Sequence, residues 1–220
     1  NIAAAAGAAK LDKVDTINIY CSWGNTLPTK EAGWPGYSIR TVMDEFTQEP
    51  VMWLDGKYVK QPVPSGETTV TMQDPIGKIT AYYVKHSEPA TMGRYIGKGC
   101  RNVTFRIGFP STDLATFKTL KSLGFAEATE IPVADARVSP LDYLTAMYQR
   151  AISKSRGEAS PREEYEYDAF RIDVFGQLRE SPAMVTYHII TWNDPERGIS
   201  SARDTAVPPS VVSQWQATGK

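Results

Sequence analysis

The densest group of chemically active side chains in the 220-residue sequence is segment 86–94, which reads HSEPATMGR. It supplies an imidazole, a carboxylate, a hydroxyl and a guanidinium directly after an expected strand, at His86, Glu88, Thr91 and Arg94. An imidazole can exchange a proton near neutral pH, a carboxylate can hold an amine, and a guanidinium can bind a carboxylate through two hydrogen bonds. A polar loop beside a proline is also typical of a simple solvated turn, and the sequence leaves both interpretations open.

The other histidine and the two cysteines give weaker signals. His188 alternates within an apolar stretch, which is typical of a strand residue rather than a catalytic base. Cys21 lies in an expected strand with no neighbouring His or Lys, so we expect a packed, unreactive thiol. Cys100 stands close to Lys98 and Arg101 and is expected to be somewhat more acidic, but no partner base identifies it as a nucleophile. No metal-ligand spacing occurs, so we expect no metal site.

Several aromatic residues occur near this segment and near the expected loop at 24–36. They are Trp23, Trp34, Tyr37, Trp53 and Tyr95. Such side chains could form the walls of a pocket for an aliphatic substrate. Aromatic residues also dominate protein cores and interfaces, so those roles stay open as well.

No nucleotide-binding motif is present. The nearest approach to a Gly-x-Gly-x-x-Gly turn is Gly97-Lys98-Gly99, but Asn102 stands at the position of the third glycine. The chain then continues into an expected strand, whereas the motif requires a helix. No P-loop, nucleophile elbow or His-Glu-x-x-His sequence occurs either. We therefore expect that this chain binds no dinucleotide by itself.

The composition excludes several classes of protein. Lys and Arg total 24 against 25 Asp and Glu, a formal charge of −1, which gives no electrostatic basis for binding nucleic acid. No apolar run approaches the roughly 18 residues that indicate a membrane-spanning helix. With 41% hydrophobic residues the chain can bury a core. The two cysteines are too few for a disulfide scaffold and favour a reduced, cytoplasmic compartment.

Hydrophobic periodicity predicts the elements that must position these side chains. Alternating or β-rich stretches predict strands at 14–23, 51–54, 57–60, 67–72, 78–84 and 103–109, and a long pair around 170–174 and 185–189. Helical spacing predicts helices at 1–10, 38–46, 111–123, 139–151 and 208–218. We expect an α+β fold, with a mixed, largely antiparallel sheet of about six or more strands covered by helices on one face.

Single residues mark the ends of these elements. Ser38 and Ser139 are expected to be helix N-caps, and Asp55-Gly56 is expected to form a tight hairpin turn. The predicted buried stripe of the helix after Ser139 consists of Leu141, Leu144, Met147, Tyr148 and Ala151.

The sequence begins with Asn1, which suits the N-cap of an alanine-rich helix. The segment is neither a signal peptide nor a transit peptide. A capped first helix implies that a loop enters it from a preceding region. We therefore expect residues 1–220 to be one domain of a longer protein.

Taken in order, several segments resemble the second domain of the saccharopine dehydrogenase-like family, which includes lysine dehydrogenases and carboxynorspermidine dehydrogenases. These segments are residues 33–45 (GWPGYSIRTVMDE), the hairpin at 55–56 with the prolines at 62 and 64, the turn at 74–77, and residues 86–91 (HSEPAT). Asn1-Ile2 resembles the end of the family's Pro-Gly-Ile-Thr-Asn stretch. Residues 204–219 resemble the segment that returns to the nucleotide-binding domain.

The resemblance implies a fold like the C-terminal domain of saccharopine dehydrogenase-like and glyceraldehyde-3-phosphate dehydrogenase-like enzymes. An N-terminal Rossmann domain, outside this chain, would hold NAD or NADP. This chain would supply substrate contacts and a homodimer interface through its sheet, and segment 205–220 would return to the Rossmann domain. The implied activity is hydride transfer at a carbon–nitrogen bond of an amino acid or polyamine derivative.

The resemblance also implies site residues. His86, Glu88, Thr91 and Arg94 would face the substrate, and the entry to the helix at 38–46 would line the same cleft with Tyr37, Ser38 and Arg40. Saccharopine reductases carry an Asn-Arg-Asp-Ser type sequence where this chain has His-Ser-Glu-Pro, which favours the lysine dehydrogenase-like branch. The alternative, from another class, is a non-catalytic dimerisation or binding module.

Overall fold

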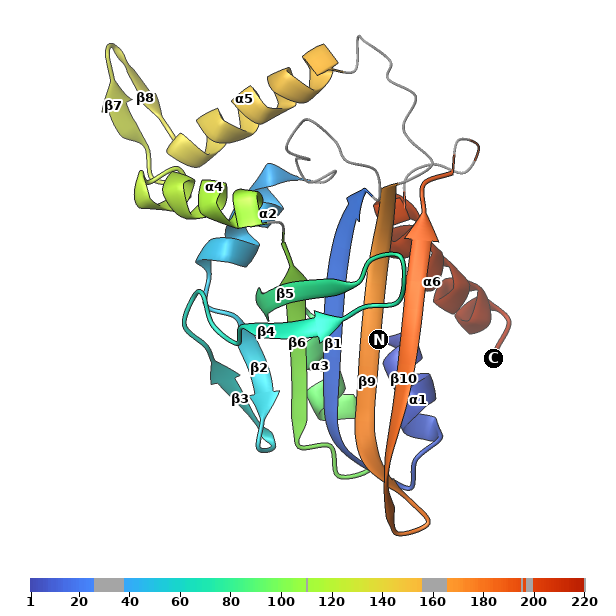
Figure 1. The fold of residues 1–220 in the computed structure, drawn as a ribbon. Coiled ribbons are helices and arrows are strands. Elements are labelled where there is room, and N and C mark those ends of the chain that lie inside the picture. Colours follow the sequence, from blue (N-terminus) through green and yellow to red (C-terminus); the bar gives the residue numbers. More distant parts are fainter. Residues whose placement is uncertain (26–37, 110, 156–165, 195, 197–199, 220) are drawn as a thin grey trace.

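The computed structural model describes residues 1–25, 38–109, 111–155, 166–194, 196 and 200–219. Within these ranges the chain forms six helices and a mixed, largely antiparallel sheet of eight strands, together with a separate two-stranded sheet (Figure 1). The predicted α+β class is confirmed.

The bounds of the elements follow chain order. The strands of the large sheet are β1 (Lys13–Asn25), β2 (Val51–Leu54), β3 (Lys57–Lys60), β4 (Thr68–Thr71), β5 (Lys78–Tyr83), β6 (Asn102–Gly108), β9 (Glu166–Leu178) and β10 (Ser181–Trp192). The small sheet pairs β7 (Ile131–Val133) with β8 (Ala136–Val138). The helices are α1 (Ile2–Ala9), α2 (Ile39–Thr47), α3 (Glu88–Tyr95), α4 (Ser111–Ser122), α5 (Pro140–Ser155) and α6 (Ser200–Ala217).

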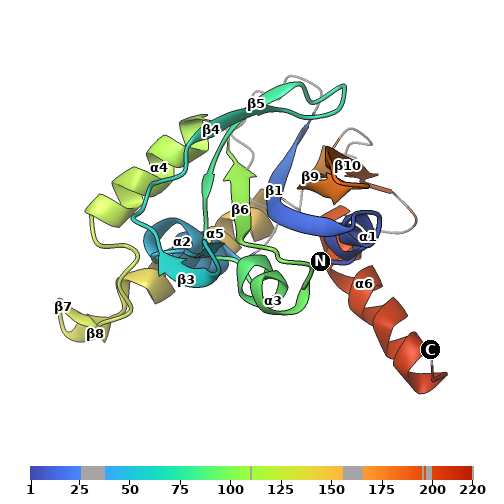
Figure 2. The same ribbon diagram turned by 90° about the horizontal axis from the view of Figure 1, so that it is seen from below.

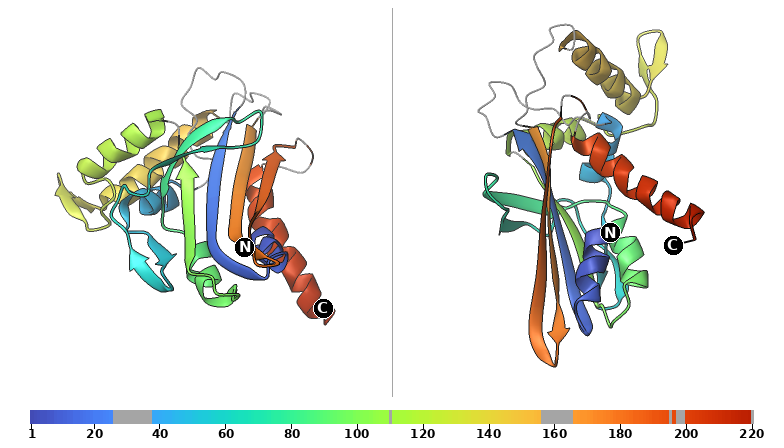
Figure 3. Two further views of the ribbon diagram at one scale, coloured as in Figure 1. Left: turned by 60° about the horizontal axis from the view of Figure 1, so that its bottom comes forward. Right: turned by 90° about the vertical axis from the view of Figure 1, so that its right-hand side faces the viewer.

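The large sheet has the strand order β10-β9-β1-β6-β2-β3, and the β4–β5 hairpin joins it because β5 pairs with the end of β6. Strands β1 and β6 run parallel, whereas the other described pairs of this sheet are antiparallel. Helices α1 and α3 lie on one face of the sheet, near the N-terminus (Figure 2). The β4–β5 hairpin crosses the opposite face (Figure 3).

Apolar side chains form a core on each face of the sheet. Along β1, Ile17 and Ile19 belong to the larger core on the helix side, whereas Tyr20 belongs to the smaller core under the β4–β5 hairpin. This is the alternation predicted for residues 14–23. The smaller core consists of Tyr20, Met72, Ala81 and Ala169.

The predicted caps and turns are largely confirmed. The Ser38 hydroxyl accepts a hydrogen bond from the Thr41 amide at 3.5 Å, and the Ser139 hydroxyl accepts one from the Asp142 amide at 3.2 Å. Both bonds satisfy amides that a helix N-terminus would otherwise leave unpaired. The turn between β2 and β3 has positive φ at both central residues, as the Asp-Gly pair predicts.

Helix α5 buries less of its surface than its sequence pattern predicts. Leu141 and Tyr148 are buried and Leu144 is half-buried, but Met147 is 42% exposed and Ala151 is exposed. The helix lies beyond the end of the sheet and packs on α2 (Figure 1). The prediction for Met147 and Ala151 was wrong because, among the described residues, the packing against α2 covers only part of the stripe.

Helix α6 begins eight residues earlier than predicted, at Ser200, and contains Pro208 and Pro209 in its interior. Its N-terminal part is held by tertiary hydrogen bonds: Thr191 donates to Asp204 Oδ1 at 2.7 Å, and Arg203 Nη1 donates to the Trp192 carbonyl at 3.1 Å. Proline disfavours the helical turn that precedes it, so the sequence predicts no helix before Pro208. The two hydrogen bonds hold that preceding turn in place at Arg203 and Asp204. The C-terminal half extends away from the sheet (Figure 3).

The C-terminal half of helix α1 is fixed to the sheet by close packing and by a lysine. Gly7 lies so close to β9 that a Cβ atom there would be 2.9 Å from Val174 Cγ2. At the C-terminal end the Lys98 ammonium donates to the carbonyls of Ala8 at 2.9 Å and Leu11 at 2.6 Å. A cation bonded to the last carbonyls of a helix also interacts favourably with its dipole.

We predict that Lys98→Met lowers the free energy of unfolding by about 2 kcal/mol, because it removes hydrogen bonds from a charged donor and takes its ammonium donor from the partly buried Leu11 carbonyl. Urea unfolding followed by circular dichroism measures the change. Lys60→Met is the matched control, because Lys60 is 74% exposed and only pairs with Glu49 at 3.7 Å. A loss no larger than that of the control, about 0.5 kcal/mol or less, would contradict this role for Lys98.

Candidate functional site

The structure joins two of the predicted site residues directly. His86 follows β5 and Glu88 is the first residue of α3, and His86 Nδ1 is hydrogen-bonded to Glu88 Oε2. The Ser87 hydroxyl donates to the same carboxylate oxygen at 3.4 Å. The side chains of His86 and Glu88 are 33% and 15% exposed, so the pair is partly shielded and still reachable from solvent.

Strand β6 holds the imidazole in place. The His86 ring stacks on Phe105 with ring centroids 3.9 Å apart and an angle of 2° between the planes. Phe105 is 1% exposed and belongs to the large core, so it gives the imidazole a rigid support. Helix α3 packs on β2 and β6, and a Cβ atom at Gly93 would be only 2.5 Å from the Trp53 ring, so the glycine permits this close approach.

The electrostatics of the pair favour an ionised carboxylate. Burial by itself raises the pKa of Glu88, but the hydrogen bond from His86 and the charge of His86 lower it, and the net pKa lies below its ordinary value. An ionised carboxylate can only accept hydrogen bonds. The proton in the His86–Glu88 bond therefore belongs to Nδ1 of the imidazole.

This arrangement assigns different tasks to the two ring nitrogens. Glu88 holds Nδ1–H, so Nε2 of the neutral imidazole keeps its lone pair and can accept a proton. The carboxylate then stabilises the imidazolium that forms, which is how an orienting acid supports a histidine base in hydrolytic enzymes. Chemically, the pair can act as a general base and, after protonation, as a general acid.

Thr91 has a structural partner that the sequence did not indicate. Its hydroxyl donates to Asn1 Oδ1 at 3.1 Å and also approaches the carbonyls of Ser87 and Glu88 at 3.2 and 3.3 Å. Asn1 occupies the N-cap position of α1, as predicted, but its side chain makes no capping bond to α1. The amide side chain instead links α1 to α3, close to the His86–Glu88 pair.

The remaining predicted residues do not converge on His86. Arg94 is exposed in the last turn of α3, and among the described residues it makes no hydrogen bond to His86 or Glu88. Arg40 donates to Asp142 at 2.8 Å, so it links α2 to α5. Ser38 lies at the same N-terminal end of α2. Tyr37 lies outside the described residues.

The part of α2 near the pair is its C-terminal end, because Lys85, next to His86, donates to Gln48 after the last turn of α2. At the entry to α2, the charge of Arg40 is compensated by Asp142 on the side of α5. That Tyr37, Ser38 and Arg40 line the substrate cleft stays a prediction. Sequence spacing could not show which end of a nine-residue helix meets the site.

Cys21 on β1 lies in an acidic environment that the sequence reasoning missed. Burial raises the pKa of the Cys21 thiol well above its usual range, and the carboxylates of Asp168, Glu45, Glu88 and Asp204 raise it further. Such a thiol stays protonated, which agrees with the expected unreactive cysteine. These residues come from four elements, so no local motif could indicate the cluster.

The expectation that Cys100 is more acidic than usual is wrong. Burial raises its pKa to about 11, and its thiol lies 3.6 Å from the Asn102 carbonyl. Lys98, whose charge was expected to favour the thiolate, is bonded to the end of α1. The thiol therefore has neither a base nor a stabilising cation.

The aromatic residues pack within the fold. Trp23 meets Phe109 edge to face at 4.9 Å, and Trp53 meets Tyr58 at 4.8 Å while donating to the Cys100 carbonyl at 3.2 Å. Tyr95 is 76% exposed. Of the two interpretations, core packing is the one observed for Trp23 and Trp53. Residues 34 and 37 lie outside the described ranges.

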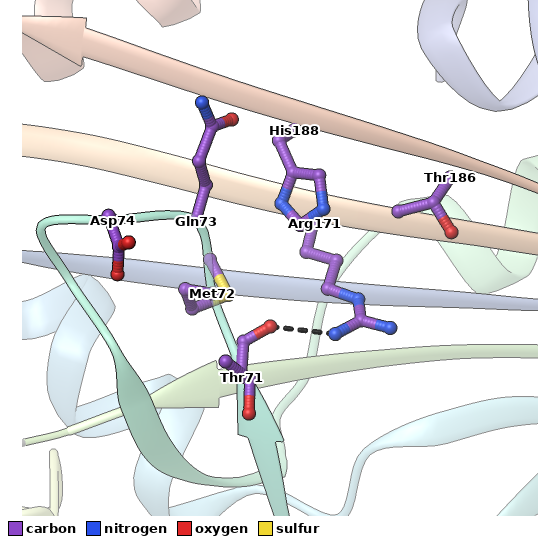
Figure 4. Close-up of a pocket in the computed structure, with 7 residues that line it drawn as sticks. All are labelled: Thr71, Met72, Gln73, Asp74, Arg171, Thr186 and His188. Atoms are coloured by element: carbon purple, nitrogen blue, oxygen red, sulfur yellow. Dashed lines mark hydrogen bonds between the residues drawn. The ribbon is translucent and has the colours of Figure 1, made fainter.

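Two open hollows occur away from segment 86–94. The first, of about 520 Å³, lies on the face crossed by the β4–β5 hairpin (Figure 4) and is lined by Thr71, Met72, Gln73, Asp74, Arg171, Thr186 and His188. There Arg171 donates to the Thr71 carbonyl at 2.7 Å and to Asp173 at 3.0 Å, so its charge is compensated. His188 lies on β10, as predicted. The second hollow, of about 620 Å³, adjoins Lys13, Lys98 and Met184.

The turn at residues 97–99 does not have the surroundings of a dinucleotide-binding motif. Strands β1 and β6 are neighbours in the sheet, but several strands and helices lie between them along the chain. Residues 97–99 lead directly into β6. No helix N-terminus therefore follows a glycine-rich turn there, as pyrophosphate binding requires. Among all the described residues, no group of three or more His, Cys, Asp or Glu side chains could hold a metal ion. None of the described helices is long and apolar enough to cross a membrane.

Neither the known protein-family models nor the curated proteins contain a match to this chain.

The lowered pKa of Glu88 predicts a pH dependence of stability. Because the folded-state pKa lies below the unfolded value of about 4.3, the contribution is fully present above that value and is lost as the pH falls through the folded pKa. We expect Glu88→Gln to remove this part of the acid destabilisation. Unfolding free energies between about pH 3 and 7 measure it.

Glu49→Gln is the control, because Glu49 is an exposed carboxylate that pairs only loosely with Lys60. Its stability profile should follow that of the unmodified chain. If Glu88→Gln also follows that profile below pH 4.3, Glu88 is not held by His86 in the folded protein.

Proposed function

We propose that this chain is the substrate-binding and dimerisation domain of an NAD(P)-dependent oxidoreductase that acts on a carbon–nitrogen bond of an amino acid or polyamine derivative. The main support for this proposal is the His86–Glu88 pair. Its ionised carboxylate leaves Nε2 of the imidazole, which is stacked on Phe105, available as a base. The resemblance of segments 33–45 and 86–91 to saccharopine dehydrogenase-like enzymes supports the reaction class.

The chemistry requires such a base. An amine must be in its neutral form before hydride leaves the adjacent carbon, and hydride transfer itself is the chemistry of a nicotinamide cofactor. In this proposal His86 Nε2 accepts the proton from the substrate ammonium, and Glu88 stabilises the resulting imidazolium. The cofactor, NAD or NADP, is held by a separate Rossmann domain, because this chain has no phosphate-binding turn.

The rest of the proposal concerns assembly. The enzyme is a cytoplasmic homodimer, and residues 205–220 return to the Rossmann domain. Exposed apolar side chains on α6 support such a return, because Val207 is 55% exposed, Val212 36% and Trp215 49%. Large apolar side chains that gather on a projecting helix are typical of a surface that another domain covers.

A non-catalytic dimerisation or binding module is the second candidate. One observation favours it: Arg40 pairs with Asp142 and Arg94 is exposed, so the arginines predicted for the site form no guanidinium clamp beside His86 in the part of the chain that the structure describes. In such a module the His86–Glu88 pair would only fix the start of α3.

The two candidates differ in what Glu88→Ala does to the enzyme that contains this chain. If the pair is the base, kcat/KM should fall at least about tenfold, which is about 1.4 kcal/mol of transition-state stabilisation. The loss is expected because, without the carboxylate, the imidazolium that forms is less stabilised and Nε2 is a weaker base. Steady-state kinetics with amino acid and polyamine substrates measure it.

Glu49→Ala controls for the loss of a carboxylate elsewhere, since the Glu49 side chain is exposed and pairs loosely with Lys60. A kcat/KM that stays within about twofold in both variants would favour the non-catalytic module.

A further inference from the structure

The edges of the large sheet differ in how they are protected against pairing with a strand of another molecule. At one end, β3 has only four residues, and two of them are lysines, Lys57 and Lys60. Strand β4, which pairs only with β5, also has four residues. Short edge strands and edge lysines are the usual devices that prevent strand addition.

The opposite edge, β10, lacks these devices. It is 12 residues long, carries no Asp, Glu, Lys or Arg, and its pairing with β9 runs without a register shift. Two of its large apolar side chains are well exposed, Met184 at 53% and Ile189 at 39%. Helices α1 and α6 lie on one face of the sheet and leave the edge of β10 uncovered (Figure 3). A long, uncharged edge strand is a template for pairing with another strand.

The hairpin fixes which backbone groups face this open edge. Its loop has two residues, Arg179 and Glu180, so Leu178 and Ser181 form a hydrogen-bonded pair and the odd-numbered residues of β10 bond to β9. The bond from the Asn193 amide to the Glu166 carbonyl, at 2.9 Å, continues the same alternation. The even-numbered residues therefore present their N–H and C=O groups outward.

The usable part of this edge is bounded on both sides. Pro182 has no N–H to donate, and the Trp192 carbonyl already accepts a bond from Arg203. Between them lie Met184, Thr186, His188 and Ile190. The midpoint of that stretch is Tyr187.

We propose that β10 pairs with β10 of a second copy of this chain, antiparallel, about a two-fold axis at Tyr187. An antiparallel pair of identical strands is self-complementary under two-fold symmetry. In this register Met184 lies beside Ile190 of the partner subunit, and on the other face Val185 lies beside Ile189 of the partner subunit. Thr186 lies beside His188 of the partner subunit.

Other two-fold registers fit less well. An axis at residue 186 places Met184 beside the imidazole of the partner's His188, and an axis at 188 places the two copies of His188 against each other. Cross-strand apolar pairs stabilise a sheet, whereas like charges opposite each other destabilise it. The register centred on Tyr187 brings together the apolar side chains that the single chain leaves exposed. This pairing specifies the interface of the homodimer in the proposed function and rests on that part of it. It does not require His86 to be catalytic, so a monomer would leave the proposed role of the His86–Glu88 pair untouched.

Sedimentation velocity of the 220-residue chain tests the pairing. We expect a concentration-dependent dimer, and His188→Pro should raise its Kd at least about tenfold, because proline removes one outward N–H without removing a bond to β9. His188→Ala is the matched control and should keep the dimer. Met184→Glu should weaken the dimer in the same way, whereas Met147→Glu, at another exposed methionine, on α5, should not.

Oxidative crosslinking tests the register. In Tyr187→Cys the two thiols face each other across the axis, so diamide should produce a disulfide-linked dimer. In Ile189→Cys the two thiols lie apart along the strands and should not crosslink. Circular dichroism verifies that each variant is folded. If Tyr187→Cys does not fold, the sedimentation experiments test the proposal without it. A monomer at concentrations up to about 100 μM, or a dimer unaffected by both His188→Pro and Met184→Glu, would overturn the proposal.

Discussion

The parallel pairing of β1 with β6 is the constraint on which the rest of the structure depends. The two strands are in register from Thr16 and Asn102 to Ser22 and Gly108, and their side chains form the centre of the large core. Parallel strands cannot be joined by a tight turn, so the chain must travel from one end of the sheet back to the other. Everything between β1 and β6 is that return connection, and it contains α2, two hairpins, α3 and the candidate site.

The position of the site follows from this return. The connection ends with β5 antiparallel to β6 and α3 packed over β6, so the residues between β5 and α3 must pass beside the middle of β6. There His86 stacks on Phe105, and Glu88 starts the helix. A base supported by the most buried strand of the sheet is held more rigidly than one on a surface loop. The second half of the pair, Glu88, is fixed because it also begins α3.

Much of this fold is predictable from sequence because the signals are local. Asp55-Gly56 determines its turn through positive φ, and strand alternation determines which face each residue of β1 takes. His86 and Glu88 were both named as candidates from the sequence because they lie two residues apart in a polar segment, but the hydrogen bond between them was not predicted. Long-range contacts were not predictable: Arg40 meets Asp142 across 102 positions, which no local pattern records. The start of α6 was missed because tertiary bonds offset the two prolines.

The central claim is that Glu88 holds the proton of His86 on Nδ1 and leaves Nε2 free. Two-bond ¹H–¹⁵N spectra of the imidazoles measure the tautomer directly, and the chain has only two histidines, so His188 serves as an internal reference. The account predicts that neutral His86 is the Nδ1–H tautomer, and that Glu88→Ala shifts it toward Nε2–H, the form expected of a neutral imidazole without this acceptor. An Nε2–H tautomer at His86 in the unmodified chain, equal to that of His188, would contradict it.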